Sequence, residues 1–326
     1  MDLLFAKNHR GDTPLHCAAR AGACKMVSHL IALAGHEGAY RKLELLRMGN
    51  DSHETALHEA VRIEEKSIVK LLMDADPELA NYPANGISPL YLAILRKDTI
   101  AVTLYKMSGG NLSYSGPDGQ NVLHAAVLQA TNTDIKVIFA VLIEELLKWN
   151  KGLATQVDKH GSTPLHFASR SYWHTRISNI VTKVFEANPT ALYQADNSGL
   201  FPIHVAASVD AISTIEFFLQ KSPNSARLRN AKGRTFLHVA VVKIRSSRAA
   251  LICRAPSVEW ILNMQDKDGN TALHLAIKRS MLKTCCALLG NKKVHVNLSN
   301  AKAQTPLDLS RSNLPRELHF TMISDR

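Results

Sequence analysis

The sequence predicts an all-α solenoid, a stack of about nine helix–turn–helix repeats joined by β-hairpin fingers. Three observations predict it: a six-residue motif recurs along the chain, its copies stand 33 to 42 residues apart, and a turn signal precedes many of them. Units that repeat at such a period bury their apolar faces only against one another. We therefore expect a single repeat domain over residues 1–326, with no second domain.

The motif occurs nine times in register. Its copies are GDTPLH (11–16), HETALH (53–58), GISPLY (86–91), GQNVLH (119–124), GSTPLH (161–166), GLFPIH (199–204), GRTFLH (233–238), GNTALH (269–274) and AQTPLD (303–308). The repeats thus begin near residues 11, 53, 86, 119, 161, 199, 233, 269 and 303. A period near 33 that carries T-P-L-H-x-A is the signature of the ankyrin repeat, so the predicted architecture is an ankyrin-repeat solenoid.

Each copy has the residues that start a helical hairpin. Thr is a helix N-cap and Pro fits the first helical turn, as in Thr13-Pro14 and Thr163-Pro164. Ahead of several copies, Asp or Asn followed three residues later by Gly favours a tight turn, as in DKDG at 266–269. A second helix with aliphatic periodicity follows, as in SIVKLLMDAD at 67–76. The two 42-residue spacings predict insertions within 35–51 and around 128–137, as lengthened second helices or loops.

Histidine ends seven of the nine copies, which raises the question of catalysis or metal binding. Equivalent positions in stacked repeats lie about one repeat apart, too far to ligate one ion together. A nucleophile and its base need one special site instead of seven equivalent ones. We therefore interpret these histidines as structural braces between a helix and the neighbouring finger, and we expect no catalytic residue, metal site or cofactor. They are His16, His58, His124, His166, His204, His238 and His274.

Cysteine content and hydropathy favour the cytosol. The five cysteines are odd in number and their spacing forms no disulfide framework, so we interpret them as reduced thiols. The most apolar stretch, VIFAVLI at 137–143, is much shorter than the run of about 18–20 residues that spans a bilayer. We expect a soluble, cytoplasmic chain.

The net charge of +11 belongs to the last third of the chain. From residue 221 onward there are 19 Lys and Arg against 6 Asp and Glu, a balance of +13, whereas the first 220 residues have a balance of −2. Such asymmetry indicates a local contact with an anionic partner.

Basic residues recur at the ends of the predicted first helices, which line the concave face of an ankyrin stack. These positions, four and five residues after the end of the motif, hold Arg20, Arg62, Arg96, Arg170, Lys243, Lys278 and Arg279. Our hypothesis is a basic stripe, strongest at the C-terminal end, that binds an acidic peptide or protein. The alternative is that these are ordinary solvated helix ends, because exposed Lys and Arg are common.

Several segments are more specific than the repeat itself. SPLYLAI (88–94), NLSYSGPDGQNVLHAAV (111–127) and LNMQDKDGNTALHLA (262–276), read in order with the other copies, resemble the plant ankyrin proteins of the accelerated-cell-death type. The resemblance implies a cytosolic ankyrin array that precedes a membrane region of several helices, the PGG domain. It also implies a role in defence, cell-death and stress signalling through protein–protein contacts, at the plasma membrane or endomembranes.

This chain departs from the family pattern at both ends. It stops without the membrane region, and it starts almost directly in a repeat. The resemblance therefore implies a soluble or truncated relative that associates with full-length family members and meets a membrane only through the missing region or by peripheral contact.

The sequence thus favours a non-enzymatic protein–protein interaction scaffold. The alternative is an adaptor that binds nucleic acid or an anionic membrane surface through the basic C-terminal third. Aromatic stacking positions and zinc knuckles, which nucleic-acid modules use, are missing from that third. In a full-length relative the basic third would lie nearest the membrane, where anionic lipid attracts it.

Overall fold

The first helix of a repeat begins where the motif supplies a cap. Thr13 is the N-cap of a helix that begins at Pro14, whose missing N–H is not needed in the first turn. The Thr13 backbone N–H donates to His16 Nδ1 (3.2 Å), so histidine takes the place of the usual Glu or Gln in a capping box. The same arrangement starts the helices that follow Thr55, Thr163 and Thr271.

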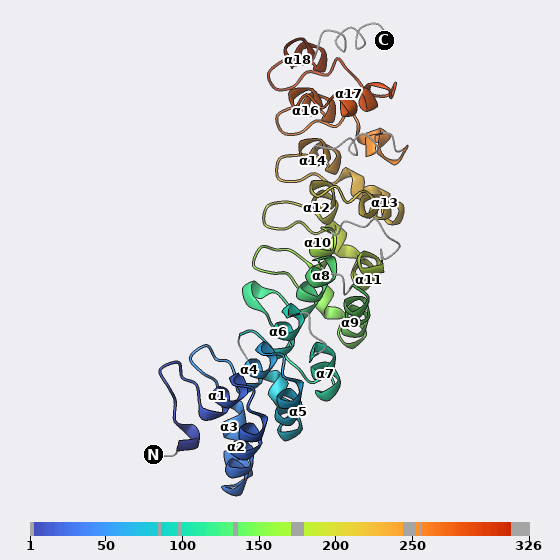
Figure 1. Ribbon diagram of the computed structural model, residues 1–326. Helices are drawn as coiled ribbons and strands as arrows, with labels where there is room; N and C mark the ends of the chain where they lie inside the picture. Colours follow the sequence, from blue (N-terminus) through green and yellow to red (C-terminus); the bar gives the residue numbers. More distant parts are fainter. Residues whose placement is uncertain are drawn as a thin grey trace. The chain divides into compact units, whose positions relative to one another are not determined.

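The computed structural model describes residues 3–83, 86–96, 100–132, 136–170, 179–243, 252–253 and 256–313. The chain divides into two compact units, Met1–Lys159 and His160–Arg326. In each unit the first helices lie in one column, the second helices lie in another, and the fingers project to one side (Figure 1). No β-strand occurs among the described residues. The predicted all-α solenoid of helix–turn–helix repeats is confirmed.

The N-terminal unit contains four pairs of helices and one additional helix among its described residues. Its first helices are α1 (Pro14–Arg20), α4 (Ala56–Arg62), α6 (Pro89–Leu95) and α8 (Val122–Asn132). Its second helices are α2 (Cys24–His36), α5 (Lys66–Ala75), α7 (Ile100–Met107) and α9 (Lys136–Trp149), and the additional helix is α3 (Ala39–Arg47). Short 3-10 helices are η1 (Leu3–Phe5), η2 (Pro77–Asn81), η3 (Pro117–Gly119) and η4 (Lys151–Ala154).

The C-terminal unit repeats the same pairing. Its first helices are α10 (Pro164–Ala168), α12 (Pro202–Ser208), α14 (Phe236–Lys243), α16 (Ala272–Lys278) and α18 (Pro306–Asn313). Its described second helices are α11 (Asn179–Ala187), α13 (Ile212–Lys221) and α17 (Leu282–Leu289). Its 3-10 helices are η5 (Pro189–Tyr193), η6 (Pro223–Arg227) and η7 (Pro256–Ile261).

The insertion after the first repeat is helical. The second helix α2 extends to His36, and α3 packs against it as an extra helix that the sequence analysis did not predict. Gly38 joins the two with a φ of +123°, a conformation that favours glycine. The second insertion lengthens both α8 and α9, and residues 133–135 between them lie outside the described residues.

The core of each unit is built from two fixed positions of the repeat. The fifth motif position is a leucine that is completely or almost completely buried in most copies, and burial of each such side chain contributes roughly 1.5–3 kcal/mol. The position two residues after the motif is alanine in eight copies, which lets neighbouring first helices approach closely. The leucines are Leu15, Leu57, Leu90, Leu123, Leu165, Leu237 and Leu273, and the alanines are Ala18, Ala60, Ala93, Ala126, Ala168, Ala206, Ala240 and Ala276.

The fingers are tight turns held by side-chain oxygens. In the finger that starts at Asp266, Oδ1 of that residue accepts from the backbone N–H groups of Asp268 (3.0 Å) and Asn270 (2.9 Å). Gly269 completes the turn at a φ of +72°, and a Cβ there would lie only 2.7 Å from the Ala301 nitrogen of the next finger. Among the described residues, the single strand-like pairing in a finger is an isolated bridge, so the predicted hairpins are reduced to turns too short for a ladder.

Candidate interaction surface

The motif histidines connect each repeat to the next. In six of them, Nε2 lies within hydrogen-bond distance of the carbonyl of the second residue in the following motif copy. Because Nδ1 accepts the cap N–H, the proton lies on Nε2, which donates to that carbonyl. The pairs are His16–Glu54 (2.9 Å), His58–Ile87 (2.9 Å), His166–Leu200 (3.1 Å), His204–Arg234 (2.8 Å), His238–Asn270 (3.1 Å) and His274–Gln304 (3.1 Å).

Burial lowers the pKa of five of these histidines, His16, His58, His204, His238 and His274, and so favours the neutral imidazole. It lowers the pKa of His204 and of His238 to about 4, although the hydrogen bonds to carbonyls act in the opposite direction. The seventh histidine, His124, is buried as well and accepts the Asn121 N–H at Nδ1 (3.2 Å). Within the described part of the chain, no three His, Cys, Asp or Glu side chains lie together as a metal site would require. The geometry of the histidines is that of a repeated structural contact.

Tyr91 stands where the third copy would have histidine. Its ring passes over Gly116, where a Cβ would lie 2.2 Å from a ring carbon, and its hydroxyl donates to Gln120 Oε1 (2.6 Å). Burial raises the pKa of Tyr91 to about 12, so the hydroxyl keeps its proton. SPLYLAI and LSYSGPDGQN, the two segments that carry the plant-family resemblance most specifically, are therefore in direct contact.

The predicted basic positions of the N-terminal unit are held by carboxylates. Arg20 forms ion pairs with Asp12 (2.9 Å) and Glu59 (2.9 Å), and Arg62 forms ion pairs with Glu54 (2.7 Å) and the same Glu59 (2.8 Å). The hydrogen bond from Arg20 lowers the pKa of Asp12 to about 2. Burial alone would raise the pKa of Glu59, but the two arginines outweigh it and lower that pKa. This network joins the first two repeats and neutralises its own arginines.

Arg96, the third predicted cation of the N-terminal unit, also lies near a carboxylate. Its guanidinium lies 3.8 Å from the Glu64 carboxylate and donates a hydrogen bond to the Arg62 carbonyl. All three predicted cations of this unit thus have acidic neighbours within the fold.

The four predicted cations of the C-terminal unit have different surroundings. The exposed Arg170 lies over the Phe167 ring, 5.5 Å from its centre. Lys278 donates to the neutral amide oxygen of Asn270 (2.7 Å). Lys243 and Arg279 are exposed at the ends of α14 and α16. No ion pair in the described residues involves any of these four side chains.

Three further lysines, which the sequence analysis did not single out, lie at the finger tips of this unit. Lys232, Lys267 and Lys302 are exposed and occupy successive fingers, accompanied by one exposed acid, Asp268. The fingers interlock, because the Lys267 N–H donates to the Lys232 carbonyl (3.0 Å) and the Ala301 N–H donates to the Asp268 carbonyl (2.9 Å). The recurrence of lysine in NAKG, DKDG and NAKA is the sequence signal that would have found them.

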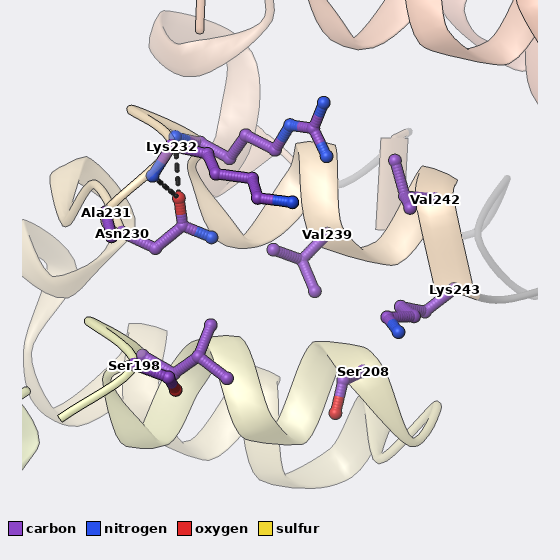
Figure 2. A pocket seen from close by; sticks show the side chains of 10 residues that line it. Ser198, Ser208, Asn230, Ala231, Lys232, Val239, Val242 and Lys243 are labelled. Atoms are coloured by element: carbon purple, nitrogen blue, oxygen red, sulfur yellow. Dashed lines mark hydrogen bonds between the residues drawn. The ribbon is translucent and has the colours of Figure 1, made fainter. Parts of the chain in front are cut away.

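A pocket of about 260 Å³ lies between α12 and α14. Val239 points into it, with Lys243 at one end, Lys232 on the finger side, and Ser198 and Ser208 opposite (Figure 2). The pocket contains a predicted basic position and an additional finger lysine, so both rows of cations border the same depression. Its lining residues are Ser198, Leu200, Ser208, Asn230, Ala231, Lys232, Arg234, Val239, Val242 and Lys243.

Throughout the described ranges, no helix has both the length and the apolar composition needed to cross a bilayer.

Comparison with known proteins identifies the repeat. A family profile described as "Ankyrin repeat" matches residues 10–38, 52–82 and 268–301. The probable 26S proteasome regulatory subunit p28 of Saccharomyces cerevisiae is 30% identical over 168 residues, which cover 51% of this chain and 71% of that protein. Protein ACCELERATED CELL DEATH 6 of Arabidopsis thaliana is 25% identical over 96% of this chain.

Other relatives are much longer. The chain spans 48% of the Arabidopsis protein, and 21% of the human transient receptor potential cation channel subfamily A member 1, to which it is 24% identical over 76% of its own length. Among solved structures, the ankyrin repeat domain of Bcl-3 aligns over 97% of this chain and 99% of that one, with 20% identity and a TM-score of 0.43. Together with the repeated motif and the helical pairs, the profile and the yeast relative show that this chain belongs to the ankyrin-repeat family.

Proposed function

We propose that the chain is a non-enzymatic interaction scaffold that binds an acidic segment of a protein partner on its C-terminal unit. The observation that carries the proposal is the set of exposed cations at the finger tips and the first-helix ends of that unit. We call it the basic finger face, and it consists of Arg170, Lys232, Lys243, Lys267, Lys278, Arg279 and Lys302. Proteins with ankyrin repeats are interaction modules, and extended surfaces of stacked repeats are the usual binding sites of such solenoids.

Charge supports the choice of this unit. Residues 160–326 have 22 Lys and Arg against 10 Asp and Glu, whereas residues 1–159 have 17 against 18. An electropositive surface attracts acidic partners over distances of about a Debye length and accelerates their association. A partner with a cluster of carboxylates would therefore be steered to the C-terminal unit.

The proposal extends to the biological setting through the Arabidopsis relative. Similarity over 96% of the chain to a protein named for accelerated cell death supports a role in plant defence, cell-death or stress signalling. The contact between Tyr91 and Gln120 supports it too, because it links the two segments on which that resemblance depends most. In this setting the chain would work as a cytosolic scaffold that associates with longer relatives at a membrane.

The experiment measures binding of the whole chain to a fluorescein-labelled 20-residue polyglutamate peptide by fluorescence anisotropy. Reversal of Lys278 and Arg279 to glutamate should weaken binding by at least about tenfold, since loss of one good charge contact is worth about 1.4 kcal/mol. The matched control is the reversal of Lys221 and Lys283, which are exposed on the second helices α13 and α17, and which should leave the affinity almost unchanged.

The second candidate function, an adaptor for nucleic acid or anionic membranes, is favoured by the same exposed lysines. A 20-nucleotide single-stranded DNA and vesicles with 30% phosphatidylserine are therefore measured in parallel. Binding of either that is tighter than peptide binding and lost in the Lys278 and Arg279 variant would replace the proposed function with this one. If the variant and the wild-type chain bind the peptide with equal affinity, the proposed binding of an acidic protein segment is overturned.

A further inference from the structure

We infer that the pocket between α12 and α14 anchors one aliphatic side chain of the partner segment, with a carboxylate on either side of it. This inference rests on the proposed function, because it names the element of an acidic segment that the basic finger face would recognise. It concerns a short sequence pattern, an acidic residue, then leucine, isoleucine or valine, then another acidic residue.

The size of the pocket points to a side chain. Small-molecule and cofactor sites have volumes of about 300–1,000 Å³, and this pocket, at about 260 Å³, lies below that range. It is bordered by two first helices and the fingers ahead of them, so a chain that lies along the finger face passes directly over it.

The chemistry of the pocket floor is aliphatic. Leu200, Val239 and Val242 line it, and Leu200 and Val242 are only half-buried. Apolar surface that leaves water on binding contributes favourably, roughly in proportion to its area. An inserted aliphatic side chain would cover this exposed apolar surface, whereas an acidic side chain on the apolar floor would lose part of its hydration there.

The rim of the pocket supplies two available positive charges at different ends. Lys243 lies at the end of α14 and Lys232 lies on the finger (Figure 2). The third cation of the rim, Arg234, is held by an ion pair with the buried Asp266 (3.0 Å) and is therefore already neutralised. Two charges separated by an aliphatic floor match two carboxylates separated by an aliphatic residue.

Hydroxyl groups complete the rim opposite the lysines. Ser208 Oγ donates to the Val205 carbonyl (2.8 Å), and Ser198 Oγ donates to Asp196 Oδ1 (2.6 Å). Since their protons are engaged, both oxygens present lone pairs, which accept hydrogen bonds from N–H groups. A peptide backbone has N–H groups that can donate to these serine oxygens. A phosphodiester backbone has acceptors alone and cannot donate to them.

The test uses three labelled peptides of equal length on the full chain. The first has the core Asp-Glu-Leu-Glu-Asp, the second has alanine in place of leucine, and the third has asparagine and glutamine in place of the acids. The first should bind at least about tenfold tighter than the second, since several buried CH₂ groups are lost, and the third should bind weakest. Ser208→Phe should fill the pocket and remove the preference for leucine, whereas Ser213→Phe, exposed on α13, should retain it.

The outcomes separate the two proposals. Equal binding of the leucine and alanine peptides by the wild-type chain, both of them weakened by Lys278→Glu and Arg279→Glu, would overturn the anchor pocket and leave the proposed function intact. Peptide binding that ignores those charge reversals would overturn the proposed function itself. Because the key comparison is made between peptides on an unaltered protein, it does not depend on whether any variant folds.

Discussion

The two units share one repeat but use its basic residues differently. In the N-terminal unit, Arg20 and Arg62 form ion pairs with carboxylates of the same fold. In the C-terminal unit, Lys243 and Arg279 are exposed and form no ion pair with other described residues. A basic residue at the end of a first helix is therefore neutralised within the fold in one unit, and exposed without an ion pair among the described residues in the other.

The difference originates at two positions of the repeat, the second residue of the motif and the residue that follows the motif. The second motif position is acidic in the first two copies, as Asp12 and Glu54, but Leu200 and Arg234 occupy it in the sixth and seventh. The residue that follows the motif is the buried Glu59 in the second copy and the pocket-lining Val239 in the seventh. Whether carboxylates occupy these two positions therefore decides whether the basic residue at the end of the first helix forms ion pairs within the fold.

Lys278 shows how small the deciding change is. It reaches back to the second motif position of its own copy, as Arg62 reaches Glu54, but it finds the amide of Asn270. The geometry is the same and the partner is neutral, so the positive charge of the lysine is not cancelled. An amide in place of a carboxylate keeps the contact and leaves the charge for a ligand.

The largest predicted effect is a loss of stability at acidic pH, which tests the buried motif histidines that occur in both units. The pKa of His204 and His238 is about 4 in the folded chain, below the value of 6.5 expected after unfolding. The unfolded chain therefore binds more protons between these values, and stability is full above pH 6.5 and falls as the pH decreases toward 4. Each such histidine lowers the free energy of unfolding by about 1.4 kcal/mol per pH unit over that range.

Urea unfolding at pH 7.5, 6.5, 5.5 and 4.5 measures this effect. His238→Gln should be less stable than the wild-type chain at pH 7.5 and should show a smaller loss on acidification. A free energy of unfolding that stays constant between pH 6.5 and 4.5 would contradict the conclusion that the buried motif histidines are neutral.

Introducing a glutamate into the C-terminal unit, at the position equivalent to Glu59, should strongly weaken its binding of the acidic leucine peptide. Val239→Glu places a carboxylate at the position that Glu59 occupies in the second copy, one helical turn before Lys243 on α14. It removes part of the aliphatic floor and neutralises a cation, so affinity for the acidic leucine peptide should fall about 100-fold, which corresponds to two charge or apolar contacts of about 1.4 kcal/mol each. Fluorescence anisotropy with that peptide measures the change, and Val239→Leu is the control that should bind within a few-fold of the wild-type chain.

The reverse exchange should weaken the N-terminal unit. Glu59→Val leaves Arg20 and Arg62 with one carboxylate each, and the free energy of unfolding should fall by about 1–2 kcal/mol, since solvent screens guanidiniums that are 35% and 37% exposed. Urea titration at neutral pH gives the value. The exposed pair of Arg96 and Glu64 supplies the control, and Glu64→Gln, which removes the charge without adding strain at the positive φ of this residue, should change stability by no more than a few tenths of a kcal/mol.

The smallest predicted effect concerns the one copy in which tyrosine replaces the histidine. Tyr91→Phe removes the hydroxyl that donates to Gln120 but keeps the ring against Gly116, so stability should fall by about 1 kcal/mol. Chemical unfolding of the variant measures the loss. Gly116→Ala should destabilise the chain more than Tyr91→Phe does, because a Cβ would overlap the ring, and the opposite order would show that this contact is loose.

Much of this fold follows from the sequence because its decisive interactions are local. The cap at Thr13 and the turn that ends at Gly269 depend on residues within one repeat, and Leu15 occupies a motif position that holds Leu or Ile in every copy, which marks the face that neighbouring repeats bury. The extra helix α3 was not predicted, because the segment 39–47 has no copy elsewhere in the chain and its position depends on contacts with α2.

The surface was only partly predictable. The positions of Arg20 and Lys243 in the repeat are equivalent within one residue, so the pattern of basic residues alone gives them the same role. Their difference depends on Glu59 in the next repeat, 39 residues away from Arg20 in sequence. Ion pairs between neighbouring repeats depend on how the repeats stack, so the sequence of a single repeat does not predict them.

The interlocked fingers have a consequence for the thermodynamics of recognition. The Lys267 N–H donates to the Lys232 carbonyl and the Ala301 N–H donates to the Asp268 carbonyl, so the main chain that carries Lys232 and Lys267 is ordered before any partner arrives. Binding then restricts only side-chain rotamers, at about 0.5–1.5 kcal/mol for each immobilised lysine, and no loop has to become ordered. Preorganisation of this kind favours fast association and an affinity that changes gradually as individual lysines are replaced.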